Sequence, residues 1–380
     1  MTCIICELNP LHNGHKFLID EAAKHGPVVL VMSGNFTQRG SAAVFDKYTR
    51  SEAAVRAGAD LVLELPFPWC SAGAADFARA GVAVAKAIGA QSLMFGSGSG
   101  NGELLQKAGI AFAEGDFDSA FETAARQDPA EGAAKLRQQI LGELFSPAEA
   151  ESLANPNDIL GIEYYRYAHL AGGISCTPVK RTEGGCVTSA TAIRSMIADG
   201  GIAYAAKYIP DEAMPVFESA CPTRETALYD MARLLLRMDA CNIENAAECE
   251  GGLGFRLRKM AGKSADGADL LRLCATKKYT DARIRRALLY SVLGITRDRV
   301  RETPLYTTVL GIGESGGAIL RQIKKSGGIE VLTKAADYDK LSPAARVQFE
   351  TAAKADRLYT MLMQNVPEEY FLSVTPYVEK

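Results

Sequence analysis

Two histidines stand close together near the N-terminus, in the stretch His-Asn-Gly-His at 12–15. They follow a short apolar run and a turn at Asn9-Pro10, a pattern that predicts a buried strand, a turn and a helix over about 15–24. The first turn of a helix offers unpaired N–H groups and the positive end of the dipole, which attract anions. Gly14 lets a phosphate approach the backbone, and the imidazoles of His12 and His15 can hydrogen-bond its oxygens. The stretch predicts a triphosphate site, although two histidines alone could simply cap a helix.

A second anion-binding pattern lies far downstream. The run at 188–194, Thr-Ser-Ala-Thr-Ala-Ile-Arg, places the hydroxyls of Ser189 and Thr191 at a helix start and Arg194 one turn later. It follows a predicted strand at 177–181 that ends in two cations, the second of which is Arg181. Alone, this run is typical of a capped helix with a surface arginine. Paired with the histidines, it predicts a second contact to the same phosphates.

The elements that must position these residues alternate between strand and helix. Apolar runs at 27–32, 60–65 and 92–95 are separated by helical patterns at 46–58 and 74–89. This alternation predicts an α/β fold with a Rossmann-like, doubly wound parallel sheet. Such sheets bind ligands at the carboxyl ends of their strands, where His12, the loop 33–40 and the glycine-rich turn 96–100 should meet. The alanine-rich stretch 103–154 predicts a helical insertion of unknown role.

Composition limits the class of protein. A chain of 380 residues is long enough for two domains, which we expect at 1–208 (nucleotide binding) and 209–380 (mainly helical). No leader and no apolar run of about 18 residues is visible, so we expect a cytoplasmic protein without a membrane anchor. Nine scattered cysteines fit reduced thiols, and the Cys3–Cys6 spacing fits a buried strand better than a metal site.

The C-terminal half is basic. Over 251–325 there are sixteen cations and six acids, a balance of +10 in a chain whose net charge is −3. Such asymmetry predicts a nucleic-acid surface, although a solvated helical face could produce part of it. The glycines at 311, 313 and 316 have dinucleotide-fingerprint spacing. Because only one short strand at 329–332 follows, we interpret this segment as a packing unit of the basic C-terminal half.

The two histidine- and hydroxyl-containing motifs resemble the paired signatures of the nucleotidylyltransferase superfamily, relatives of class I aminoacyl-tRNA synthetases. Longer phrases are similar to those of the bacterial tRNA(Met) cytidine acetate ligases, and the likeness covers nearly the whole chain. These phrases lie at 9–15, 32–40, 60–66, 95–97, 156–164, 276–280 and 306–313. Leu8 and Leu11 stand where the family pattern favours aromatic residues, which changes the expected wall of the nucleotide pocket and leaves the phosphate contacts in place.

The resemblance implies an ATP-dependent ligase. Acetate would attack the α-phosphate of ATP, accompanied by Mg²⁺, and the acetyl group would pass to the N4 amine of the wobble cytidine in elongator tRNA(Met). His12, His15 and Arg194 would be catalytic. The implied nucleotide-binding residues are Ile5, Cys6, Glu7, Leu8, Asn9, Pro10, His12, Asn13, Gly14, His15, Gly96, Asn157, Arg181, Ser189 and Thr191. Lys47 and Arg39 are weaker candidates that could equally be surface cations.

Other functions remain open from the sequence. A small-molecule adenylyltransferase of cofactor biosynthesis would share both phosphate motifs, but it would have no use for a basic C-terminal half. A non-catalytic, nucleotide-sensing RNA-binding protein is disfavoured because both motifs are intact. The oligomeric state, the selectivity for acetate over other carboxylates and the tRNA bases that are read are not visible in the sequence.

Overall fold

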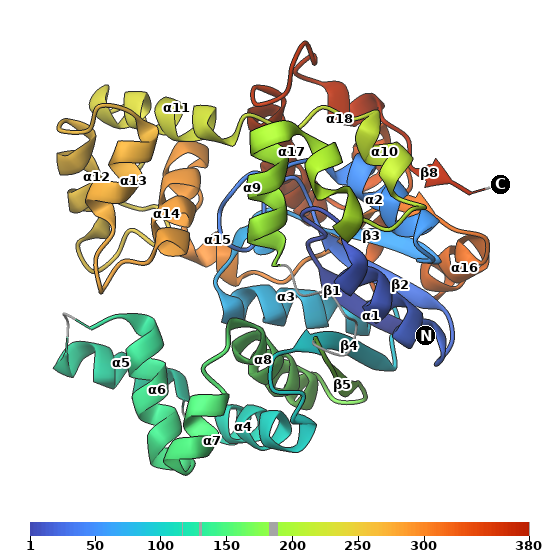
Figure 1. Ribbon diagram of the computed structural model, residues 1–380, viewed down its shortest axis with the longest axis horizontal. Coiled ribbons are helices and arrows are strands. Elements are labelled where there is room, and N and C mark those ends of the chain that lie inside the picture. Colours follow the sequence, from blue (N-terminus) through green and yellow to red (C-terminus); the bar gives the residue numbers. More distant parts are fainter. Residues whose placement is uncertain (116, 129–130, 182–188, 380) are drawn as a thin grey trace.

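A single sheet organises the molecule (Figure 1). The computed structural model describes residues 1–115, 117–128, 131–181 and 189–379. The sheet has eight strands in the order β5-β4-β1-β2-β3-β6-β7, with β8 paired to β6. The strands are β1 (Thr2–Cys6), β2 (Val28–Ser33), β3 (Leu61–Leu65), β4 (Ser92–Ser97), β5 (Ser175–Lys180), β6 (Tyr306–Ile312), β7 (Glu330–Leu332) and β8 (Tyr377–Val378).

The first five strands run parallel. β1 pairs with β2 from Thr2 opposite Val28 to Cys6 opposite Met32, and β4 pairs with both β1 and β5. Every residue of β2 and β3 is buried, as expected for central strands covered on both faces, which explains why both strands are almost wholly apolar. The prediction of a doubly wound parallel sheet is confirmed.

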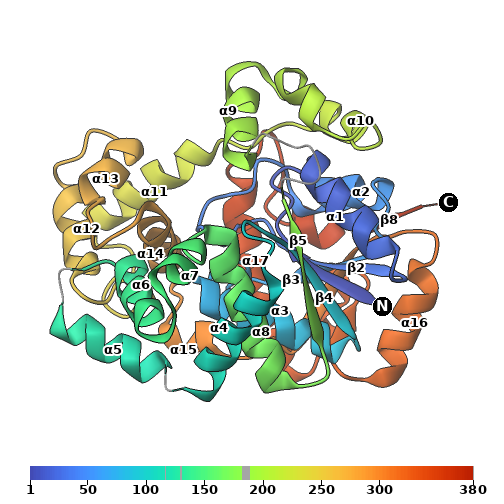
Figure 2. The ribbon, with the colours of Figure 1, turned by 60° about the horizontal axis from the view of Figure 1, so that its bottom comes forward.

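Helices cover both faces of this sheet (Figure 2). The crossovers β1 to β2 and β2 to β3 carry α1 (Asn13–Ala23) and α2 (Lys47–Arg56), whereas the crossovers to β4 and β5 carry α3 (Ala74–Ala87) and α8 (Pro156–Ala171). Because the strand order reverses at β1, right-handed crossovers place these two pairs on opposite faces. α3 and α8 pack directly on each other.

Two helical groups, joined to the sheet at different points of the chain, and a short helical segment between them are attached to this core. Between β4 and α8 the chain forms α4 (Gly102–Glu114), α5 (Phe117–Gln127), α6 (Ala133–Leu144) and α7 (Pro147–Ser152). After β5 come α9 (Ala190–Gly200), the 3₁₀ helix η2 (Ile202–Tyr208) and α10 (Met214–Glu218). The second group, at the left of Figure 1, contains α11 (Glu225–Arg237), α12 (Leu253–Ala261), α13 (Gly267–Cys274) and α14 (Asp281–Leu293), and α15 (Arg297–Arg301) leads back to the sheet. No described helix combines the length and the apolar character needed to cross a bilayer.

The chain then returns to the sheet. β6 pairs antiparallel with β3, and it is followed by α16 (Gly316–Ser326), β7, the 3₁₀ helix η3 (Ala335–Lys340), α17 (Pro343–Thr360), α18 (Tyr370–Ser373) and β8. The β–α–β unit at 306–332 is therefore part of the same sheet as the N-terminal strands, not of a separate half. Its glycines allow close packing: a Cβ on Gly313 would lie 2.6 Å from the carbonyl oxygen of Ala59, and one on Gly316 would lie 2.0 Å from that of Asp60.

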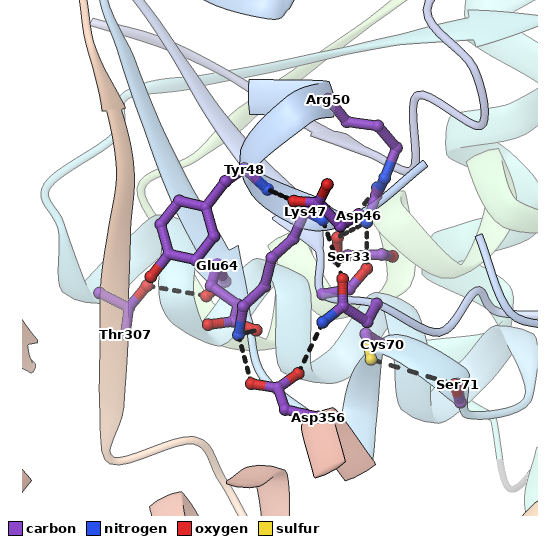
Figure 3. Close-up of polar contacts among 12 residues, drawn as sticks. Ser33, Asp46, Lys47, Tyr48, Arg50, Glu64, Cys70, Ser71, Thr307 and Asp356 are labelled. Atoms are coloured by element: carbon purple, nitrogen blue, oxygen red, sulfur yellow. Dashed lines mark hydrogen bonds and ion pairs between the residues drawn. The ribbon is translucent and has the colours of Figure 1, made fainter. Parts of the chain in front are cut away.

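A buried ion cluster joins the two ends of the chain (Figure 3). Lys47 Nζ lies 2.8 Å from Glu64 Oε1 in β3 and 2.7 Å from Asp356 Oδ2 in α17. The Asn35 side chain donates to the other Asp356 oxygen at 2.8 Å. Burial lowers the pKa of Lys47, but Asp356 and Glu64 raise it more, so that the net pKa lies well above its ordinary value. Lys47 is thus neither a surface cation nor a phosphate contact, and that expectation is wrong.

Replacing Lys47 with Met should destabilise the protein strongly, because Glu64 and Asp356 would remain buried without their cation. Breaking a buried pair in this way costs about 3–5 kcal/mol. Urea denaturation of the parent and K47M measures the change in the free energy of unfolding. The matched control is K340M, which removes a lysine paired with Asp337 on the surface. Equal denaturation midpoints for K47M and K340M would contradict the structural role of the cluster.

Candidate active site

The predicted site lies where the strand order reverses. β1 and β4 are neighbours in the sheet, and the crossovers that leave them run in opposite directions. The histidine-containing loop follows β1, and the turn at 96–100 follows β4. Doubly wound sheets bind ligands in the crevice at such a reversal, outside the carboxyl ends of the strands. The topology therefore brings together two loops that are more than eighty residues apart in the sequence.

The two histidines form one hydrogen-bonded unit at the start of α1. His12 is the N-cap, and its Nδ1 accepts from the backbone N–H of Gly14 at 3.1 Å. His15 Nδ1 accepts from the backbone N–H of His12 at 3.3 Å, and the two ring centroids lie 3.8 Å apart. The helix begins at Asn13, earlier than the predicted residue 15, because the side chain of His12 itself supplies the cap. Since both Nδ1 atoms accept, a neutral ring carries its proton on Nε2, where it can be donated to a ligand.

Both imidazoles are neutral at pH 7. Burial, followed by the nearby cations of Arg181 and Arg194, lowers the pKa of His12 to about 4. The pKa of His15 also lies well below its ordinary value, through burial first and then through His12 and Arg181. The site therefore presents neutral hydrogen-bond donors next to two permanent cations.

Arg194 connects the second motif to the first. Its guanidinium donates to the backbone carbonyl of Asn9 at 3.0 Å and to Thr191 Oγ1 at 3.1 Å. Ser189 caps α9 by accepting from the N–H of Ala192 at 3.2 Å. The structure thus brings Arg194 and Thr191 to the loop between β1 and α1, as the paired motifs predict. Residue 188 of the same motif lies outside the described residues.

Arg181, Asn157 and Gly96 form a third group at the end of β4. Arg181 donates to Asn157 Oδ1 at 3.1 Å, and a Cβ on Gly96 would lie 3.3 Å from Arg181 Cγ. The buried carboxylate of Asp158 holds the neighbouring turn, since it accepts from Ser97 Oγ at 2.5 Å and from the N–H groups of residues 98 and 99 at 3.0 and 2.9 Å. The sequence analysis did not single out Asp158, so its support of the turn was missed.

The predicted nucleotide-binding residues Ile5, Cys6 and Leu8 differ in what their side chains contact. The Ile5 side chain packs against α3, where a Cβ on Gly81 would lie 2.7 Å from Ile5 Cδ1, so only the backbone of Ile5 faces the loop. Burial raises the pKa of the Cys6 thiol, which keeps it protonated and unreactive. Leu8 is buried with a φ of 49°, a conformation that a non-glycine residue adopts only under constraint.

Three further residues of the loop fix its path. Asn9 Oδ1 accepts from the N–H of Val44 at 2.8 Å, and Pro10 is buried beside it. Asn13 donates from its side chain to the backbone carbonyl of Lys207 at 3.2 Å, which links α1 to η2. These contacts leave the backbone of the loop, rather than the side chains of Asn9 and Pro10, to meet a ligand.

Glu7 lies at the end of β1, between the histidine loop and the loop 34–41. Its Oε1 accepts from the backbone N–H of Gln38 at 2.6 Å. Burial raises the pKa of Glu7, whereas the Gln38 N–H and the cations of Arg194 and Arg39 oppose that rise. Glu7 is thus the acid at the centre of a group of arginines.

Comparison with known proteins identifies the family. The model of the HIGH nucleotidyl transferases matches residues 1–371. This chain belongs to that family. A curated relative from Caldanaerobacter subterraneus subsp. tengcongensis, named tRNA(Met) cytidine acetate ligase, is 33% identical over 384 residues and covers 95% of both chains. A protein of the same name from Thermoanaerobacter sp. strain X514 is 32% identical, also with 95% coverage of both chains.

Solved structures of the same family share this fold throughout. Thermotoga maritima TmcAL bound with alpha-thio ATP superposes with a TM-score of 0.91 at 28% identity, covering 99% of each chain. The apo form of that protein gives a TM-score of 0.90 at 27% identity, with the same coverage. As a HIGH nucleotidyl transferase, this chain thus retains the family fold from end to end, including the returning strands β6–β8.

The low pKa of His12 makes folding stability depend on pH. Between pH 6.5 and 4 the unfolded chain binds a proton at His12 that the folded protein does not bind, so stability decreases as the pH falls through this window. His12→Asn should keep the helix cap, since Asn is a good N-cap, and remove this titration. We expect the parent to lose about 1–3 kcal/mol more than H12N between pH 6.5 and 4.

Urea denaturation of the nucleotide-free proteins at both pH values measures this difference. Carboxylates contribute equally to parent and variant and cancel in the comparison. His25→Asn, at an exposed histidine just beyond α1, is the control and should show the same pH dependence as the parent. Identical pH dependence in H12N and the parent would mean that His12 is not held neutral by burial.

Proposed function

We propose that this protein is a tRNA(Met) cytidine acetate ligase. It would form acetyl-adenylate from ATP and acetate and transfer the acetyl group to the N4 amine of the wobble cytidine of elongator tRNA(Met). The observation that carries the proposal is the position of both phosphate-binding motifs at the reversal of strand order, in a chain that matches proteins of this name over 95% of their length. The likeness to an ATP-analogue complex supports ATP as the nucleotide.

In the first step a carboxylate oxygen of acetate attacks the α-phosphorus of ATP, and the bond to the bridging oxygen breaks to release pyrophosphate. No covalent bond to the protein is needed, so positioning and electrostatic stabilisation supply the rate. His12 and His15 would donate to α- and β-phosphate oxygens from Nε2. Arg194, Arg181, Ser189 and Thr191 would hold the leaving pyrophosphate.

The nucleoside would lie along the loop after β1 and the turn after β4. Gly96 offers the close backbone approach and Asn157 the polar side chain that a nucleotide pocket needs, and both are already in contact with Arg181. The described residues contain no cluster of three or more His, Cys, Asp and Glu side chains suited to a metal ion. A Mg²⁺ ion accompanying ATP would therefore be held mainly by phosphate oxygens and water.

In the second step the N4 amine attacks the acetyl carbon, AMP leaves and the amine loses a proton. We assign nucleotide chemistry to residues 1–208 and tRNA capture to the segment after it, in particular to the helices α11–α14. Exposed cations there could reach RNA phosphates; they include Arg258, Lys259, Lys263, Arg272 and Lys277. Arg286 is less suited, because it is buried and bonded to Glu248 at 2.6 Å.

Replacing His15 with Ala should slow adenylate formation about 10²–10³-fold, the cost of losing one preorganised donor to a developing charge. Acetate-dependent exchange of labelled pyrophosphate into ATP measures this step without RNA. His25→Ala removes an exposed histidine on the other side of α1 and should exchange at the parental rate. Exchange by H15A at the parental rate would remove His15 from the mechanism.

Mass spectrometry of nucleosides tests the overall reaction. Unmodified elongator tRNA(Met) transcript is incubated with the protein, ATP and labelled acetate, digested and analysed. We expect labelled N4-acetylcytidine that depends on ATP and is absent when the wobble cytidine is replaced by uridine. Pyrophosphate exchange without any label in RNA would favour adenylyl transfer to a small molecule instead.

A further inference from the structure

Arginines from three separate segments lie close together, and two of them, Arg39 and Arg194, lie near Glu7. Arg39 belongs to the loop 34–41 after β2, Arg194 to α9 and Arg285 to α14. Burial lowers the pKa of Arg194, Glu7 and Glu225 oppose that effect, and Arg39 and Arg285 lower the pKa further. Arg39 and Arg285 are therefore each close enough to Arg194 to repel it. Like charges gathered at one place indicate a site for an anion.

Tight packing fixes Arg39 beside Arg285. The adjacent Gly40 has a φ of 75°, and a Cβ there would lie 2.5 Å from the backbone nitrogen of Arg286 and 2.8 Å from the carbonyl carbon of Arg285. Arg286 also donates to the carbonyl of Gln38 at 3.3 Å. The loop thus contacts α14 on both sides of Arg39, through the helix backbone at Gly40 and through the Arg286 side chain at Gln38. Arg39 and Arg285 are thereby placed at the junction of the sheet and the helical group.

Among the described residues, no hydrogen bond uses the donors of these two arginines. In the described part of the chain, Arg39 makes no hydrogen bond or ion pair, and the buried Nε of Arg285 donates to no acceptor. The Arg285 guanidinium lies 5.9 Å from the ring centroid of Tyr229, which orients it without occupying its N–H groups. The neighbouring Arg283 and Arg286, by contrast, bond to Glu248.

We propose that Arg39 and Arg285 bind a phosphodiester group of the RNA strand next to the acceptor cytidine, an inference that rests on the proposed function. A guanidinium fork matches phosphate oxygens, and two of them can bind both non-bridging oxygens of one phosphate. Arg39 and Arg285 together would hold the RNA strand so that the acceptor cytidine base, turned out of the strand, enters the site over Glu7. The phosphate contact fixes position and carries no sequence information.

The sheet order favours an RNA phosphate over the phosphates of ATP. β2 and β4 flank β1 on opposite sides, and Gly96, Asn157 and Arg181, which are assigned to the nucleotide, lie on the side of β4. Arg39 follows β2, and Arg285 comes from the helical group that contains the exposed cations. A nucleotide between β1 and β4 would leave this side of Glu7 to the second substrate.

The test uses full-length R39Q, R285Q and the double variant. Arg321→Gln is the matched control, because Arg321 is an exposed arginine on α16, away from the helical group. Filter binding of unmodified elongator tRNA(Met) transcript between 50 and 200 mM salt gives affinity and salt dependence. We expect each single variant to bind about tenfold more weakly and each lost phosphate contact to reduce the salt slope by about 0.7–0.9. Acetate-dependent pyrophosphate exchange should remain within twofold of the parent.

Arg285→Lys separates the phosphate contact from a folding defect. Lysine keeps the positive charge but lacks the paired N–H donors of the guanidinium group. This variant should therefore bind RNA more weakly than the parent, with the same dependence of affinity on salt concentration. Affinity and slope equal to those of the parent in the double variant would overturn the proposal. A parallel loss of pyrophosphate exchange would also overturn it, since it would assign the two arginines to ATP. Failure of the parent itself to acetylate the transcript would instead refute the proposed function.

Discussion

One buried guanidinium holds the site together. Arg50, on α2, is fully buried and donates to the carbonyl oxygens of Phe45, Glu7, Ser33 and Gly34. Its hydrogen bonds join the carboxyl ends of β1 and β2 to the segment that enters α2, and Figure 3 shows the contact with Ser33. Because a buried cation without these acceptors would cost several kcal/mol, the loops that carry Glu7 and Arg39 must keep this geometry. The histidine loop begins one residue after Glu7, so the hydrogen bond from Arg50 to the Glu7 carbonyl also fixes the direction in which this loop starts.

The second constraint joins distant parts of the chain. Lys47, three residues before Arg50, is bonded to Asp356, 309 residues away. Asn35 connects to both, because its amide donates to Asp356 and its oxygen accepts from the N–H of Lys47 at 2.8 Å. A chain ending near residue 208 would therefore lose β6 from the edge of β3 and the carboxylate that pairs with Lys47. The nucleotide-binding part and the C-terminal segment share one sheet, and α11–α14 form a helical group beside it.

Local sequence patterns predicted the features of the structure that depend on interactions between residues close together in the chain. The apolar runs of β1–β4, the helices between them and the positions of His12, His15 and Arg194 follow from periodicity, turn residues and the chemistry of helix starts. Contacts between residues far apart in the chain could not be predicted from these local sequence patterns. The antiparallel addition of β6 to β3 and the partner of Lys47 depend on contacts across the whole chain. The cation count over 251–325 did not distinguish Arg286, buried against Glu248, from exposed cations such as Arg258.

The choice of histidine follows from the charges around it. Arg181 and Arg194 already supply fixed positive charge, and further cations at 12 and 15 would repel them in the absence of a ligand. Neutral imidazoles donate hydrogen bonds without that cost, and burial keeps them neutral at pH 7. A triphosphate brings several negative charges to the same place, which must raise the proton affinity of both rings. The histidines can thus strengthen their interaction as charge builds on the phosphates, whereas a lysine or arginine would carry full charge in the empty site and in the transition state alike.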